Sequence, residues 1–93
     1  MDNKLQEEVS KGNRAKAAYD EFVSSFLDTA RETLFENFKS IPISDEKSIM
    51  ECKRLLKTLD IFEDNIKTFI ETGKLASFQL EQEKKDEHKP TVN

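Results

Sequence analysis

The sequence contains few of the residues that build turns, metal sites and membrane spans. Its 93 residues include two glycines and two prolines, whereas a sheet-rich domain needs turn residues about every eight to twelve positions. The single cysteine excludes an internal disulfide and a zinc site made from several cysteines of one chain. No apolar run approaches the roughly 18 residues that a membrane span requires. These absences favour one all-α domain with no membrane segment, metal or cofactor.

Catalytic side chains and strong net charge are also scarce. The net charge of −4 provides no basic face for direct nucleic-acid binding. The one histidine, His88, lies in a charged stretch without a partner held beside it. Asp60, Glu63 and Asp64 lie within one helical turn and are candidate cation ligands, but Lys67 follows on the same face and repels a cation. We interpret them as a solvated helix face and expect no enzymatic activity.

Apolar residues recur every three or four positions in two long segments, which is the spacing of an amphipathic helix. The first segment spans about residues 14–39, with apolar positions 15, 19, 22, 26, 30, 34 and 38. The second spans about residues 45–72, with apolar positions 49, 52, 55, 56, 59, 62, 66, 69 and 70. Cys52 and most of the phenylalanines fall on these stripes and are predicted to be core. Each helix would be about 40 Å long.

Local signals place the ends of the two helices. Pro42 disfavours helical geometry at Ile41, so the first helix is predicted to end there. Ser44 is a favourable N-cap for the second helix. Gly73 is predicted to close that helix in a left-handed conformation. Residues 75–80 would then fold back as a short third helix.

The predicted architecture is an antiparallel αα-hairpin over residues 14–80. Residues 1–13 are expected to be a flexible N-terminal segment, and residues 81–93 a disordered charged tail. A short connection favours an antiparallel pair. The apolar stripe of the first helix is too wide for one neighbouring helix to cover. We therefore expect a homo-oligomer, in which self-association completes a helical bundle.

One surface of the second helix departs from the simple amphipathic pattern. Met50 and Ile61 lie three turns apart and point nearly opposite the apolar stripe, and Lys53, Arg54 and Lys57 lie beside them. Apolar residues among cations are typical of protein interfaces, where Met and Arg are enriched. These five residues are the predicted partner-binding site. The alternative is two scattered exposed apolar residues, which are common on protein surfaces.

Three stretches occur in a distinctive order: SKGNRAKAAYDEF, FKSIPISDEKS and FIETGKLASFQL. They contain a Gly-x-x-Ala opening, an aromatic residue at a helix end, a Pro-containing link with a following Asp, and a Thr-Gly-Lys-Leu-Ala ending. The matching positions are Gly12, Ala15, Phe38, Pro42, Asp45 and residues 72–76. Over roughly residues 10–80 the chain resembles a group of small, mostly uncharacterised helical proteins of tailed bacteriophages, often encoded among virion-assembly genes. Phe38 stands where that group has Trp, and the group's Pro is missing after Ala18.

The resemblance implies a phage setting and carries no catalytic residues. We expect a non-enzymatic structural or assembly module of the virion, in the head or DNA-packaging region, that docks on a larger phage structural protein. The expected location is the virion or the host cytoplasm. The alternative is a phage-encoded regulator that binds and inhibits a host enzyme, such as a nuclease or RNA polymerase.

Overall fold

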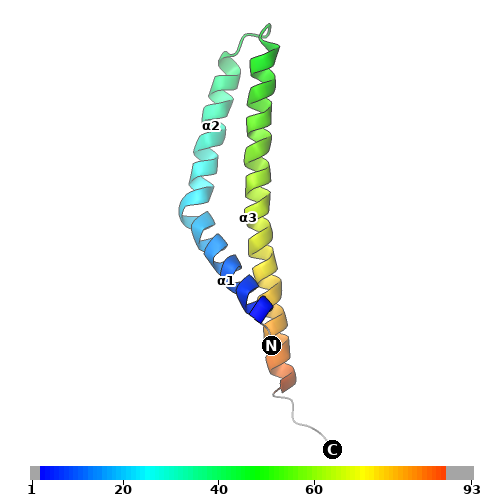
Figure 1. Ribbon diagram of the computed structural model, residues 1–93. Helices are drawn as coiled ribbons and strands as arrows, with labels where there is room; N and C mark the ends of the chain where they lie inside the picture. Colours follow the sequence, from blue (N-terminus) through cyan, green and yellow to red (C-terminus); the bar gives the residue numbers. More distant parts are fainter. Residues whose placement is uncertain (1–2, 88–93) are drawn as a thin grey trace, which may run out of the picture.

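The computed structural model describes residues 3–87, which are helical apart from one link at residues 41–45 (Figure 1). In chain order the elements are α1 (Asn3–Ala18), the π-helical turn η1 (Tyr19–Val23), α2 (Ser24–Ser40) and α3 (Glu46–Glu87). No strand occurs within residues 3–87, so the all-α prediction is confirmed. The first three elements are continuous, and the chain returns past them along α3 (Figure 1).

The first helical segment is longer than predicted and contains an irregular turn. It begins at Asn3, so most of the expected flexible segment at residues 1–13 is helical. η1 interrupts the α-helical hydrogen bonding directly after Ala18. A π turn adds about one residue to a helical turn and rotates the following residues. As a result Leu27 is fully buried, whereas Phe26, which the predicted stripe placed inside, is 61% exposed.

The link between α2 and α3 begins as the sequence predicted. Ile41 has an extended backbone with φ −73° and ψ 127°, as expected of a residue before proline. The prediction of Ser44 as the N-cap is wrong, because Asp45 accepts the hydrogen bond from the Ser48 amide at 3.2 Å and α3 begins at Glu46. Ile43 is 92% exposed and closes no core.

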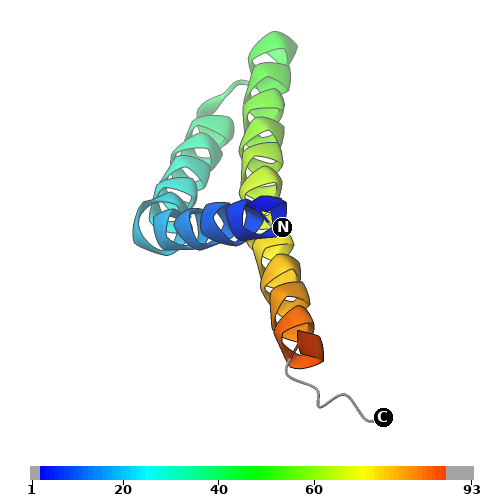
Figure 2. The ribbon, with the colours of Figure 1, turned by 60° about the horizontal axis from the view of Figure 1, so that its bottom comes forward.

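The prediction that Gly73 ends a helix is wrong, because α3 runs from Glu46 through it to Glu87. The predicted third helix at residues 75–80 and the first part of the predicted disordered tail are therefore parts of α3, while residues 88–93 lie outside the described residues. Neither glycine has a positive φ. The glycine instead permits a close helix crossing. A Cβ built on Gly12 would lie 2.7 Å from the Gly73 Cα, so the two backbones touch where α1 crosses α3 (Figure 2).

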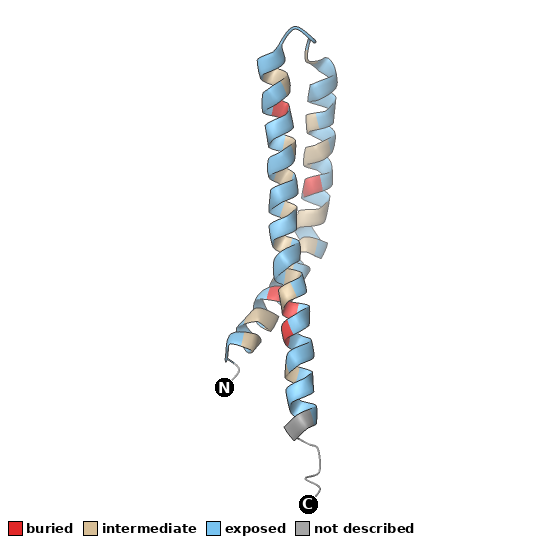
Figure 3. Ribbon diagram, turned by 90° about the vertical axis from the view of Figure 1, so that its right-hand side faces the viewer, coloured by how far each residue is buried: buried red, intermediate tan, exposed pale blue. Residues whose placement is uncertain are grey.

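The core of the single chain is very small. Among the described residues the buried apolar side chains are Leu27, Cys52 and Ala76. Exposed residues dominate every helix (Figure 3). The seven phenylalanines, most of which were predicted to be core, are all at least 43% exposed, so that prediction is wrong for the isolated chain. No helix in residues 3–87 has the length and apolarity needed to cross a membrane.

The glycine contact yields a test of the helix crossing. We expect Gly12→Ala to destabilise the protein by up to about 2 kcal/mol, because the new methyl group overpacks against the α3 backbone at a cost of about 1–3 kcal/mol. The net value allows for the roughly 1 kcal/mol that alanine gains over glycine in a helix. Thermal unfolding followed by circular dichroism measures the change.

The matched control is Asn13→Ala, at the exposed neighbouring position of α1. It raises helix propensity without bringing a methyl group against α3, so we expect unchanged or slightly higher stability. Equal or greater stability of Gly12→Ala than of Asn13→Ala would show that the crossing does not require glycine.

Candidate functional site

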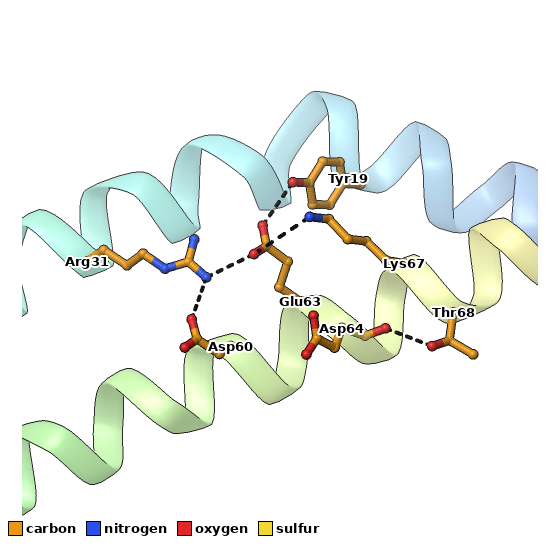
Figure 4. Close-up of polar contacts among 7 residues, drawn as sticks. All are labelled: Tyr19, Arg31, Asp60, Glu63, Asp64, Lys67 and Thr68. Atoms are coloured by element: carbon orange, nitrogen blue, oxygen red, sulfur yellow. Dashed lines mark hydrogen bonds and ion pairs between the residues drawn. The ribbon is translucent and has the colours of Figure 1, made fainter.

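A cluster of five polar side chains joins the first helical segment to α3 (Figure 4). Arg31 of α2 places Nη2 3.0 Å from both Asp60 Oδ1 and Glu63 Oε1. Tyr19 of η1 donates its hydroxyl hydrogen to Glu63 Oε2 at 2.9 Å. Lys67 Nζ lies 3.9 Å from Glu63 Oε1. We call these residues the polar cluster.

Glu63 is the centre of the polar cluster because it lies on the side of α3 that faces the first segment. Its side chain is only 17% exposed, and a carboxylate in such a place requires hydrogen-bond donors. Hydrogen bonds from Arg31 and then Tyr19 lower the pKa of Glu63, since both favour the charged form. Hydrogen bonds to Glu63 and Asp60 raise the pKa of Arg31.

The polar cluster acts as a clamp between helices rather than as a reactive group. Both Glu63 oxygens already accept hydrogen bonds, so this carboxylate is not positioned to take a proton from a substrate. The interpretation of residues 60, 63 and 64 as one solvated face is therefore wrong for Glu63. A signal was present in the sequence, because Arg31 is the only cation in residues 17–38. The spacing of residues in the sequence does not indicate which carboxylates Arg31 contacts.

The five predicted partner-binding residues are all exposed, but they do not form one site, because three of them line two separate depressions and Lys57 and Ile61 line neither of these. Met50 and Lys53 line an open apolar groove of about 490 Å³ near the link between α2 and α3. The other residues that line it are Phe35, Phe38, Ile49 and Leu56. Arg54 instead borders a separate depression with Glu51, Leu55 and Thr58. Sequence reasoning missed the α2 side of the groove.

The groove is apolar at its base and cationic at its edge. Lys39 Nζ lies 5.1 Å from the centre of the Phe35 ring, a cation–π geometry, and it also pairs with Glu36 at 3.0 Å. Lys53 supplies a second ammonium group. Such a groove can take an apolar side chain whose neighbour is acidic.

Comparison of the chain with known protein families, curated protein sequences and solved structures finds no match.

The lowered pKa of Glu63 predicts a pH dependence of stability. A carboxyl group whose pKa is lower in the folded than in the unfolded state stabilises the fold when it is ionised in both states. That contribution to stability is complete above the pKa of the unfolded state, and it is lost as the pH falls through the pKa of the folded state. We therefore expect the midpoint of thermal unfolding to fall as the pH decreases below about 4.5, the ordinary value for Glu63.

The Glu63→Gln variant isolates this contribution. It should be less stable than the original chain at neutral pH, and its midpoint should fall less on acidification. Asp64→Asn is the control, because the Asp64 carboxylate takes no part in the polar cluster (Figure 4). If both variants kept the original acid dependence, Glu63 would not be the group responsible.

Proposed function

We propose that the protein is a non-enzymatic interaction module of a tailed bacteriophage, which associates with copies of itself and docks on a larger virion component. The observation that carries this proposal is the exposure of all seven phenylalanines, each at least 43% accessible. Burying one large apolar side chain contributes about 1.5–3 kcal/mol, so half-exposed rings on this scale represent a large unused stabilisation. The resemblance to phage proteins supplies the setting, in the head or DNA-packaging region.

Two surfaces of different character support a module with two kinds of contact. The first surface is formed by exposed phenylalanines, and it favours an apolar and uncharged partner surface. The other combines the groove with the predicted cationic residues Lys53, Arg54 and Lys57, and it favours an acidic partner. A bundle of several copies would use the first surface for assembly and leave the second free for docking.

Mass spectrometry of purified virions tests the proposed function. We expect the protein in stoichiometric copies within intact particles. Its absence from particles, together with expression early in infection and capture of a host enzyme, would contradict the structural role and favour the host-directed regulator.

The cationic surface can be tested within the same system. We expect Arg54→Glu combined with Lys57→Glu to abolish incorporation into particles while helicity and oligomeric state persist. Both residues are exposed, and surface changes of this kind shift stability by about 0.5 kcal/mol or less each. Like charges against an acidic partner instead cost several kcal/mol. Incorporation is measured by mass spectrometry of particles made with the variant.

The matched control is Lys84→Glu combined with Lys85→Glu, which makes the same charge change at exposed positions near the end of α3. We expect it to leave incorporation unchanged. Equal incorporation of both double variants would place the partner site elsewhere on the chain.

A further inference from the structure

We propose that a second copy of this chain packs on one defined apolar surface, the phenylalanine face. This face consists of Phe22, Phe26, Leu55, Phe62 and Phe69, whose exposures lie between 47% and 62%. The inference rests on the proposed self-association and names the surface that performs it.

The five residues form two rows beside the contact between the helices. On α3, Leu55, Phe62 and Phe69 recur every seven residues and so lie in one line along the helix. Each comes directly before a residue that is half-buried against the first segment. Those half-buried residues are Leu56, Glu63 and Ile70. Phe22 and Phe26 come directly before two further inward-facing residues, Val23 and Leu27.

The two rows share one side of the molecule. In an antiparallel helix pair, consider the residues that face the other helix. The residue just before each of them lies on one side of the pair, and this side is the same for both helices. The residue just after each of them lies on the opposite side of the pair. Arg31 and Asp60 each follow an inward-facing residue, and their 3.0 Å ion pair shows that such residues do share a side. The phenylalanine face is therefore the side opposite the polar cluster.

The phenylalanine face contains no charge from Leu55 to Thr72, and Glu51 and Arg54 border it at the Leu55 end. Its α3 row reads Leu55, Thr58, Phe62, Asn65, Phe69 and Thr72, and the next position, Ala76, is buried. These positions are spaced by three and four, the repeat of a coiled-coil seam. Its α2 row continues with Thr29 and Thr33. In a chain with 37% charged residues, an uncharged row of this length indicates a surface that becomes buried.

Charge identifies a second copy as the occupant. In a two-fold dimer the same patch meets itself, so a patch whose charges all have one sign meets charges of that sign. The uncharged phenylalanine face can pair with itself without this repulsion. The cationic surface could not, since Lys53, Arg54 and Lys57 would then meet a surface of the same charge.

The area available reaches the lower bound for a specific interface. The chain exposes 7685 Å², whereas a compact monomer of this size exposes about 5,500 Å². The face is about 25 Å long from Leu55 to Thr72 and about two helices, or 20 Å, wide. This footprint of roughly 500 Å² on each copy gives the roughly 1,000 Å² in total that a specific interface needs, and it is smaller than the roughly 800 Å² per partner of a standard interface.

Asn65 provides a polar contact suited to self-pairing. It is exposed and lies between Phe62 and Phe69 in the uncharged row. Its side-chain amide has both donors and an acceptor, so it can hydrogen-bond to Asn65 of a second copy when the two-fold axis passes beside it. A single polar residue in an apolar seam also selects the register of pairing.

A matched pair of threonines on α3 tests the proposal. Thr58 lies on the phenylalanine face, whereas Thr68 lies outside this row, about 80° around α3 from Thr58. Both are exposed, and each hydroxyl donates to the carbonyl oxygen four residues earlier at 2.9 Å. Thr58→Glu and Thr68→Glu therefore remove the same hydrogen bond and add the same charge to different faces. The Thr58 change also lies one turn from Arg54, which favours its local helix.

Sedimentation of the full chain and the two variants gives the readout, with circular dichroism as the check on helicity. We expect the original chain and Thr68→Glu to be oligomeric at micromolar concentration. Thr58→Glu should self-associate at least about 100-fold more weakly, since each copy would bury a carboxylate in an uncharged interface. Oligomers of equal strength for both variants would overturn this surface and leave self-association standing. A monomeric original chain would overturn both.

A second measurement does not disturb the interface by charge. Asn65→Cys and Asp64→Cys introduce adjacent exposed thiols, one on the phenylalanine face and one off it. Peptide mapping separates them from the buried Cys52. As protein concentration rises into the oligomeric range, maleimide labelling should slow about tenfold or more at position 65 and stay constant at position 64. Equal labelling at both positions across the range would contradict the proposal.

Discussion

The contact between Gly12 and Gly73 is the constraint on which the arrangement of the helices depends. With no side chain on either residue, α1 and α3 approach until the backbones meet, and a Cβ on either glycine would lie within 2.8 Å of the other's Cα. α1 consequently lies across α3, while α2 runs beside it toward the link at residues 41–45 (Figures 1 and 2). The segment between these two attachments bows away from α3, and η1 lies at the bow (Figure 1).

The π turn of η1 allows both halves of the first segment to face α3. Tyr19 and Leu27 both point inward, although eight residues of regular α-helix would rotate the second by about 80° from the first. The additional residue in the turn absorbs that rotation. Phe22 and Phe26 are thereby turned to the surface. The polar cluster then joins the bow to α3 through Tyr19, so a local irregularity decides which side chains are inside and which are available to a partner.

The sequence predicted those features that depend on local chemistry. The all-α class, the end of α2 before Pro42 and the burial of Cys52 follow from periodicity and backbone preferences, and the Cys52 thiol donates to the Leu34 carbonyl at 3.4 Å. Features that depend on contact with a residue far away in the sequence could not be predicted. Gly73 has the spacing of a helix stop and becomes a crossing point only because Gly12 meets it. The carboxylates that Arg31 contacts are determined by the register between α2 and α3. The exposure of the predicted partner-binding residues was foreseen, but it was not foreseen that Met50 and Lys53 line one depression and Arg54 another.

The chain therefore has strong helix-forming sequence and little interior of its own. Its helices contact each other along a narrow line, and most of the large apolar side chains lie outside that line. If another copy covers them, folding and association are linked, and the midpoint of thermal unfolding must rise with protein concentration. Circular dichroism melts over a hundredfold range of concentration measure this directly. We expect the midpoint to rise by several degrees across the range, whereas a constant midpoint with full helicity would show that the monomer is stable alone.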